Sequence, residues 1–205
     1  MSKYFKPIVR LAKAKKGGRG RGPSGPSEVA STWDPANVGA DITLSNLDKT
    51  AACGGQTGDW AISTGSKTAG KLYFELVADA SNSDFCYAGV VATAKGKENT
   101  GVQGASTEML WKRNGAWSVG GGTAPAAFVT GDILGFAFDF STMKIRAFKN
   151  NVEQGLSPAA TIVGAIKIGF THTFGTSPNT FTIRTTTAEF SYAPPTGYIA
   201  WAAGT

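Results

Sequence analysis

The stretch that decides the fold is GDILGFAFD, residues 131–139. Phe136 and Phe138 stand two positions apart, so they share one face of an extended strand, and Ile133 lies on the opposite face. Gly135 has no side chain, which predicts that another sheet approaches the strand closely at this point. These residues favour a buried strand within a layered β protein.

Short segments with period-two alternation recur from residue 33 onward and predict further strands. The segments are residues 41–45, 71–77, 85–93, 133–140, 143–148, 166–172 and 181–187. Clusters of Gly, Asn, Asp and Ser separate many of them, and no long stretch has the period of a helix. Residues 149–152, KNNV, predict a tight hairpin turn because Asn tolerates left-handed backbone conformations. Many short strands joined by turns favour an antiparallel β-sandwich or barrel.

The composition fits one β domain with an appendage. The chain has 205 residues, of which 27 are Gly and 17% are charged. A body of this size buries roughly 70% of the surface of its unfolded chain, so it needs neither a disulfide framework nor a structural metal. Cys53 and Cys86 are the only cysteines, and we expect two small buried residues. The sequence leaves open whether their thiols are free.

Positive charge is concentrated near the N-terminus. The first 27 residues contain eight of the twenty Lys and Arg residues and no Asp or Glu, whereas the remaining residues contain twelve basic and fourteen acidic side chains. The eight cations are Lys3, Lys6, Arg10, Lys13, Lys15, Lys16, Arg19 and Arg21. The net charge of +6 therefore belongs to an arm, and the body is slightly acidic.

This division predicts three segments. Residues 1–16 mix basic and apolar side chains and form a partly amphipathic arm. Residues 17–32 begin with GGRGRGPSGPS, a Gly-, Pro- and Ser-rich sequence that predicts an extended linker. Residues 33–205 carry the alternating pattern and form the β-sandwich.

Five segments of the body resemble the SPRY family, in the variant common in bacteriophage and prophage proteins. They are WDP (residues 33–35) with ITLS (42–45), GKLYFE (70–75), GDILGFAFD (131–139), IRAFKNNVEQ (145–154) and FSYAPPTGY (190–198). Asn151 stands where the family usually has Gly, which leaves the type of that hairpin turn open. The order and spacing of all five segments fit the family, and they cover about residues 33–201.

The resemblance implies an all-β fold, a bent two-sheet antiparallel β-sandwich of the concanavalin-like, jelly-roll kind, preceded by the extended basic arm. SPRY domains are mostly protein-binding modules whose ligands contact loops at one end of the sandwich. The family has no shared catalytic residues, and its phage members look like parts of virion or tail proteins. The resemblance therefore implies a binding module, although a fold alone does not supply a function.

No constellation of residues predicts catalysis, a metal or a cofactor. His172 is the only histidine and lies in a predicted strand, which favours a structural role over that of a general base. Asp79, Asn82 and Asp84 have a spacing loosely suited to Ca²⁺, but an ordinary polar turn is the favoured interpretation. The sequence lacks hydrolase and phosphate-binding motifs. We therefore expect no enzymatic activity, no metal and no cofactor.

The segment WKRNGAW, residues 111–117, is the candidate ligand site of the body. Trp111 and Trp117 flank a basic turn that contains Lys112 and Arg113. Trp and Arg are enriched at binding hot spots, so this hairpin could present a ligand surface. Alternatively its aromatic side chains pack inward, as often happens in the corresponding hairpin of SPRY-like domains. Inward packing is the favoured interpretation, and surface recognition stays open.

Three kinds of partner fit the arm. Its cations could bind nucleic-acid phosphates, an anionic membrane surface or an acidic groove on a protein of a larger particle. The phage-like resemblance favours the third kind.

The expected protein is accordingly a virion component made in the bacterial host cytoplasm, of the tail-fibre, adaptor or capsid-decoration type. The arm would anchor it to a neighbouring virion protein within a homo-oligomeric assembly, and the sandwich would project, with a host-surface glycan or protein as its candidate ligand. The alternative is a protein-interaction module tethered to nucleic acid or to a membrane surface. The sequence has no run of apolar residues that predicts a membrane span. It leaves the position in the particle and the oligomeric symmetry open.

Overall fold

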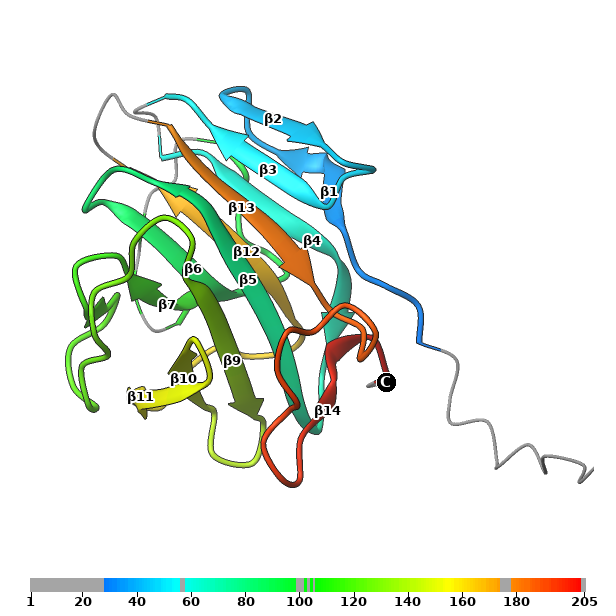
Figure 1. The fold of residues 1–205 in the computed structure, drawn as a ribbon, viewed down its shortest axis with the longest axis vertical. Coiled ribbons are helices and arrows are strands. Elements are labelled where there is room, and N and C mark those ends of the chain that lie inside the picture. The colour runs from blue at the N-terminus through cyan, green and yellow to red at the C-terminus, as the bar shows by residue number, and fades with distance from the viewer. Residues whose placement is uncertain are drawn as a thin grey trace, which may run out of the picture.

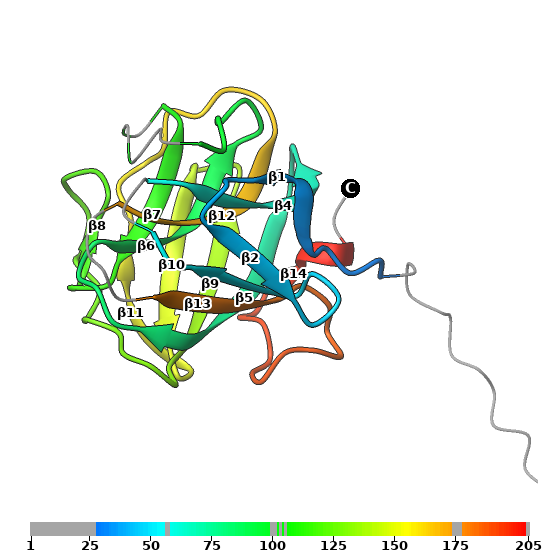
Figure 2. The same ribbon diagram turned by 90° about the horizontal axis from the view of Figure 1, so that it is seen from above.

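The computed structural model of the protein describes residues 28–55, 58–98, 102, 104, 106–173 and 178–203. The arm, with its cations from Lys3 to Arg21, lies outside the described residues. The chain enters the described part at Glu28 and forms two antiparallel sheets that pack face to face (Figures 1 and 2).

The two sheets divide the strands almost equally. One sheet has six strands in the order β1-β4-β12-β6-β7-β8. They are β1 (Trp33–Val38), β4 (Trp60–Lys67), β6 (Cys86–Ala92), β7 (Glu108–Lys112), β8 (Ala116–Trp117) and β12 (Ile166–His172). The eight-stranded sheet has the order β11-β10-β9-β5-β13-β3-β2, and β14 pairs with β5 in parallel. Its strands are β2 (Ile42–Ser45), β3 (Thr50–Cys53), β5 (Lys71–Ser81), β9 (Ile133–Asp139), β10 (Lys144–Lys149), β11 (Val152–Leu156), β13 (Asn179–Arg184) and β14 (Ile199–Ala200). The 3-10 turn η1 (Trp201–Ala203) follows β14.

This architecture confirms the predicted antiparallel β-sandwich, although the ends of several strands differ from the prediction. Strand β12 occupies its predicted range, but the strand predicted over residues 181–187 ends at Arg184. The carboxylate of Glu189 accepts the N–H groups of Thr185 at 2.9 Å and Thr186 at 3.1 Å. The N–H groups of Thr185 and Thr186 therefore donate to a side chain instead of to a neighbouring strand, and β13 ends before them.

Aromatic side chains fill the space between the sheets. Phe136 and Phe138 of β9 are both fully buried in the core, as predicted. Phe74 of β5 stacks on Phe136 with ring centroids 4.9 Å apart, and Trp111 of β7 meets the same ring from the opposite sheet at 6.1 Å. Burial of each ring contributes about 1.5–3 kcal/mol, and each ring pair adds about 0.5–1.5 kcal/mol. These contacts join the two layers.

Gly135 does not face the other sheet, so the predicted sheet-to-sheet approach at this position is wrong. It lies on the outer face of β9, where a Cβ atom would stand 2.5 Å from the Tyr73 hydroxyl oxygen and 3.2 Å from the Cβ atom of Phe148. Both neighbours belong to adjacent strands of the same sheet, β5 and β10. The missing side chain of Gly135 makes room for the ring of Tyr73.

The KNNV segment forms a two-residue hairpin turn of type I′, the feature that the sequence left open. Asn150 and Asn151 both have left-handed backbone, with φ of 50° and 68°, and Lys149 pairs with Val152 across the turn. The side-chain oxygen of Asn150 also accepts the N–H of Ile133 at 2.9 Å. Asn tolerates this conformation, which explains why the turn forms without Gly at position 151.

A buried carboxylate holds the closing segment of the chain on the outer face of β5. Glu75 is fully buried, and its carboxylate accepts the N–H groups of Ser191 at 2.8 Å and Tyr192 at 3.0 Å. The hydroxyl of Tyr73 donates a third hydrogen bond at 3.1 Å, and Arg184 Nη1 lies 3.5 Å from the carboxylate. Glu75 thus connects the GKLYFE segment, residues 70–75, to the FSYAPPTGY segment, residues 190–198.

Cys53 and Cys86 are buried free thiols, as expected of two small buried residues. Burial raises the pKa of Cys53 to about 11. The pKa of Cys86 is raised as well, again mainly by burial. Neither thiol therefore carries the thiolate character that reactive cysteines need.

Candidate functional site

The two tryptophans of the WKRNGAW hairpin pack inward. Trp111 is fully buried and Trp117 is 7% exposed. Each indole N–H finds a backbone carbonyl, because Trp111 Nε1 donates to Ala126 at 3.1 Å and Trp117 Nε1 donates to Thr123 at 2.9 Å. For these two side chains the inward-packing interpretation is confirmed, so any ligand surface of the hairpin must come from its other residues.

A three-residue loop shapes this hairpin. Lys112 of β7 pairs with Ala116 of β8, and the N–H of Gly115 donates to the carbonyl of Lys112 at 3.0 Å. Gly115 has a left-handed φ of 88°, and a Cβ atom there would stand 2.7 Å from the carbonyl oxygen of Pro125. Glycine at this position is what allows the loop of a G1-bulge hairpin to lie against the neighbouring segment.

Another residue of the hairpin, Lys112, lies next to two aromatic side chains, Phe85 in the loop before β6 and Tyr87 in β6. Lys112 Nζ lies 5.0 Å from the ring centroid of Phe85 and 5.7 Å from that of Tyr87. Phe85 is 41% exposed, so the cation and the apolar ring are presented to solvent together. A cation over an aromatic ring contributes about 0.5–1 kcal/mol at an exposed site, which restricts the Lys112 side chain to one region.

Arg113 completes this surface. Its Nε donates to the carbonyl of Ser81 at 3.0 Å, and its Nη1 pairs with the carboxylate of Asp84. The pairing leaves Asp84, one residue of the loosely Ca²⁺-like segment, engaged by a cation. We refer to Phe85, Tyr87, Lys112 and Arg113 as the hairpin patch. Its two cations are positioned by neighbouring groups before any partner binds.

The described residues offer no catalytic or metal-binding constellation. Among them no group of three or more His, Cys, Asp and Glu side chains could hold a metal ion. His172 is fully buried in β12, which fits a structural strand residue.

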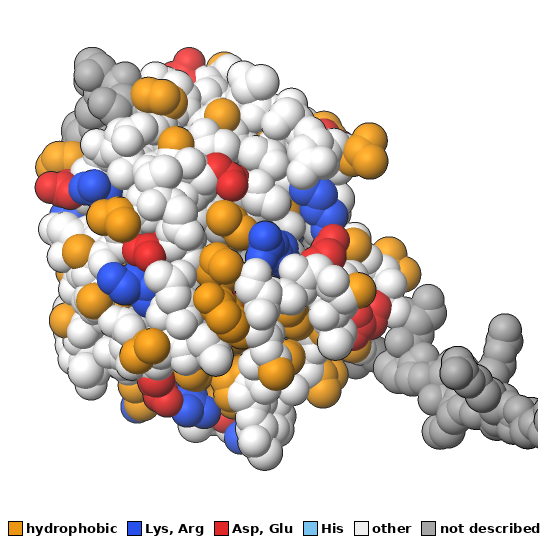
Figure 3. Space-filling view, in the orientation of Figure 1, with side chains coloured by type: hydrophobic (Ala, Val, Ile, Leu, Met, Phe, Trp, Pro, Cys, Tyr) orange, Lys and Arg blue, Asp and Glu red, His pale blue; other side chains and the backbone are white. Residues whose placement is uncertain are grey.

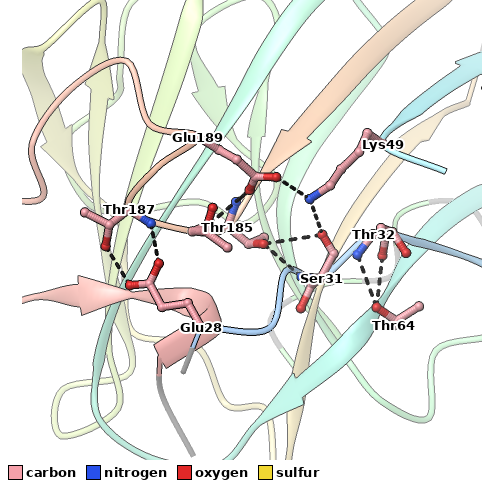
Figure 4. Close-up of polar contacts among 9 residues, drawn as sticks. Glu28, Ser31, Thr32, Lys49, Thr64, Thr185, Thr187 and Glu189 are labelled. Atoms are coloured by element: carbon pink, nitrogen blue, oxygen red, sulfur yellow. Dashed lines mark hydrogen bonds and ion pairs between the residues drawn. The ribbon is translucent and has the colours of Figure 1, made fainter. Parts of the chain in front are cut away.

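The chain enters the sandwich through residues 28–32, which we call the arm root (Figure 4). The Glu28 carboxylate accepts the N–H of Thr187 at 2.7 Å and its hydroxyl at 2.6 Å. The N–H of Ser31 donates to the Thr185 hydroxyl at 2.9 Å, and the carbonyl of Ser31 accepts Lys49 Nζ at 3.0 Å. The last part of the predicted linker is thus bound to the body by Thr185 and Thr187, which follow β13, and by Lys49, which precedes β3.

Glu189 fixes the residues that receive the arm root. Its carboxylate lies 2.8 Å from Lys49 Nζ and accepts the N–H groups of Thr185 and Thr186. Partial burial alone would raise the pKa of Glu189, but the hydrogen bonds from Lys49 and from the two N–H groups lower it below its ordinary value. The carboxylate is therefore charged at neutral pH and supports the arm root through Lys49.

The hairpin patch and the arm root lie at opposite ends of the sandwich. Lys112 pairs with Tyr87 near the start of β6. The loop before β6 begins after Ser81, and Ser81 pairs with Asn179 at the start of β13. The hairpin patch therefore lies at the end of the sandwich where β13 begins. The arm root instead contacts residues that follow Arg184, at the other end of β13. Figures 1 and 2 both show β7 and the entering chain on opposite sides of the molecule.

A strained turn lies beside the arm root, between β2 and β3. Three consecutive residues other than Gly have left-handed backbone, with φ of 54° at Asn46, 53° at Leu47 and 60° at Asp48. Asn and Asp tolerate this region, but for other residues it costs roughly 1–2 kcal/mol. Leu47 is also 91% exposed. We call residues 46–48 the Leu47 turn.

A shallow groove of about 340 Å³ also lies at this end. It is lined by Glu28, Thr187, Pro194, Tyr198, Ile199, Ala200 and Ala203. Ile199 is 50% exposed, and Val29 in the arm root is 76% exposed. Together with the Leu47 turn, these residues give the end where the chain enters an apolar character.

Positive and negative side chains are mixed on the face of the body shown in Figure 3. Several are ion pairs, for example Lys71 with Asp139 at 3.1 Å and Arg146 with Glu153 at 2.6 Å. Ion pairing of this kind agrees with the slightly acidic balance of the body. No helix among the described residues is long and apolar enough to cross a membrane.

The two-sheet antiparallel architecture belongs to the concanavalin-like β-sandwiches, and within that class the fold is that of SPRY domains. The chain is similar to the SPRY domain of human HERC1, with a TM-score of 0.65, 15% identity, and coverage of 78% of this chain and 99% of that chain. It is also similar to the TRIM65 PSpry domain, with a TM-score of 0.57, 18% identity, and coverage of 75% and 90%. Stonustoxin contains a similar region, with a TM-score of 0.56, 17% identity, and coverage of 77% of this chain and 27% of the toxin chain. No family model matches the sequence, and no curated protein matches it either.

These similarities confirm the resemblance to SPRY domains at the level of the fold. Sequence reasoning located Lys112 and Arg113 but missed their aromatic neighbours Phe85 and Tyr87, because residues so far apart meet only through the register of β6 and β7. The arm root carried a weak signal, since Glu28 is the first acidic residue of the chain. No feature of the sequence pointed to the Leu47 turn.

Proposed function

We propose that this chain is a non-catalytic bacteriophage virion component that binds a ligand through the hairpin patch of its SPRY sandwich. Its basic arm anchors it to a neighbouring virion protein, and the sandwich projects from the particle. The ligand is a protein or glycan of the host surface. The chain acts as one copy in a homo-oligomeric assembly.

The observation that carries this proposal is the separation of the two ends. A tethered recognition module needs its attachment point away from its ligand surface, so that a bound partner does not meet the particle. The arm root is fixed beside Thr187, whereas Lys112 and Arg113 lie at the far end of the strands. The virion context is supported by the phage-like sequence motifs and by the confinement of eight cations to the arm.

The ligand role is tested with the double variant Lys112→Glu, Arg113→Glu. Reversal of two charges in a binding patch should weaken binding to host cells about tenfold or more. The matched control is Lys144→Glu, Arg146→Glu on β10, which reverses the same number of charges and also removes one surface ion pair. Equal binding by both folded variants and the parent would exclude the hairpin patch.

The anchoring role is tested by deletion of residues 2–21, which removes all eight cations of the arm. We expect a folded body that no longer copurifies with particles, and normal incorporation would refute the anchor. The same deletion tests the alternative, a module tethered to nucleic acid or to an anionic membrane. Binding of the full chain to duplex DNA or to anionic vesicles that falls steeply with salt and disappears on deletion would favour that alternative.

A further inference from the structure

We propose that the Leu47 turn is a protein-contact site, in which Leu47 enters an apolar pocket of the neighbouring protein that receives the arm. The inference rests on the proposed function, because that function supplies the neighbouring protein. It adds a contact on the folded body to the anchor made by the arm.

Solvent exposure and backbone strain coincide at Leu47. A single exposed apolar side chain needs no explanation, and Val163 is even more exposed, at 93%, without a left-handed φ. Leu47 differs because its backbone occupies a region that Leu disfavours. An Asn at this position would remove both the exposed apolar group and much of the strain. Strained backbone of this kind clusters at functional sites.

Backbone hydrogen bonds to the surrounding structure hold the Leu47 turn in place. The carbonyl of Asp48 accepts the N–H of Trp33 at 2.8 Å, and the N–H of Lys49 donates to the carbonyl of Asn46 at 3.1 Å. The carbonyl of Lys49 accepts the N–H of Ile183 at 2.9 Å. Leu47 is therefore presented on a rigid support, and binding it requires little loss of conformational freedom.

The Leu47 turn lies next to the arm root. Lys49 follows the turn directly and donates to Ser31 in the arm root, and Trp33 follows the arm root and bonds to Asp48. Any protein that holds the arm close to Glu28 therefore also comes near Leu47. Val29, itself 76% exposed, extends the apolar contact toward the arm.

The chemistry of the turn defines the pocket that it fits. Leu47 requires an apolar cavity large enough for one branched aliphatic side chain. The Asp48 carboxylate forms no ion pair with the described residues, so a Lys or Arg at the rim of that cavity would complement it. The partner is thus a folded protein with an apolar pocket bordered by a cation, next to the acidic groove proposed for the arm.

The test compares Leu47→Asn with Leu47→Met and with Val163→Asn in thermal unfolding and in incorporation into particles. Leu47→Asn relieves the backbone strain, so its melting temperature should rise by about 2–4 °C. Its incorporation should nevertheless fall about tenfold, because the apolar contact is lost. Leu47→Met keeps an apolar side chain and should retain incorporation, and Val163→Asn should change neither quantity.

The outcomes separate this inference from the proposed function. Normal incorporation of Leu47→Asn, together with loss of incorporation on deletion of residues 2–21, overturns the contact site and leaves the anchor intact. Normal incorporation of the deletion variant overturns the anchor and the contact site together. A melting temperature of Leu47→Asn below that of the parent contradicts the strain argument and also overturns the inference.

Discussion

Replacement of Glu75 by Gln should destabilise the fold more than any change at a surface ion pair. The carboxylate of Glu75 is fully buried and accepts three hydrogen bonds, from Ser191, Tyr192 and Tyr73. Gln offers one oxygen acceptor and places an NH₂ donor where the second oxygen stood. At least one of the two backbone N–H groups then faces another donor, and Arg184 loses its counter-charge.

The expected loss follows from these contacts. Hydrogen bonds to a charged group contribute about 1.5–3 kcal/mol each, and the ion pair adds less than a fully buried pair would because the Arg184 side chain is 28% exposed. The contributions are not additive, so we expect the free energy of unfolding to fall by about 3–5 kcal/mol. With a urea m-value of about 2 kcal/mol/M, the unfolding midpoint should fall by about 2 M.

The assay is urea unfolding followed by tryptophan fluorescence. The chain has five Trp residues, and all of them are buried in the sandwich, including Trp201 in η1 after the closing segment, so their emission reports global unfolding. The matched control is Glu153→Gln, since Glu153 forms an ion pair with Arg146 on the surface. Exposed pairs contribute about 0–1 kcal/mol. Equal small losses in both variants would refute the structural role of Glu75.

Three further predictions concern other parts of the molecule. Gly115→Ala should lower the free energy of unfolding by about 2 kcal/mol or more, because it combines an unfavourable left-handed φ with a clash against Pro125. Gly131→Ala is its control, since Gly131 has a φ of 92° but no atom near the added Cβ, and urea unfolding should show the smaller loss there. The pKa of Glu189 is lower in the folded protein than its ordinary value of 4.5. Its stabilising contribution is therefore present above about pH 4.5 and is lost as the pH falls through the folded-state pKa. Glu189→Gln should be less stable than the parent near pH 7 and should lose less stability on acidification, as urea midpoints at several pH values would show. Cys53 and Cys86 should resist a thiol reagent in the native protein near pH 8, because both are buried and the pKa of Cys53 is about 11. Two equivalents should react after unfolding, and rapid reaction of the native protein would contradict the burial.

The sequence predicted strands with one open face, such as β13, and it also predicted β5 and β9, which are buried along most of their length but contain the GKLYFE and GDILGFAFD segments. In β13 the burial alternates along Asn179–Arg184, and the period-two pattern is visible in the residues. Strand β4 was not predicted, since Trp60, Ala61, Ile62 and Ser63 are all buried. Trp60 and Ile62 form a second apolar cluster with residues of β6 and β7. A strand buried on both faces loses its alternation, and nothing in the sequence shows which segments cover the outer face.

The candidate site also has features that the sequence predicted and features that depend on tertiary contacts. The basic turn of the hairpin was visible in the sequence, whereas the inward direction of Trp111 and Trp117 depends on carbonyl groups of residues 123–126 that accept their N–H groups. Gly135 shows the opposite case. Its role in a motif was clear, but whether it faces a second sheet or the ring of Tyr73 depends on the register between β5 and β9.

The arm root also determines how the sandwich carries a mechanical load. Thr32 exchanges hydrogen bonds with Thr64 of β4 in the six-stranded sheet, whereas Glu28 and Ser31 bond to residues that follow β13 in the eight-stranded sheet. A pull along the arm is therefore shared between both layers before it reaches the edge strand β1. A tension that would peel off a strand held by one sheet alone must here break contacts to both sheets at once, so the attachment at residues 28–32 resists unfolding from the N-terminal side.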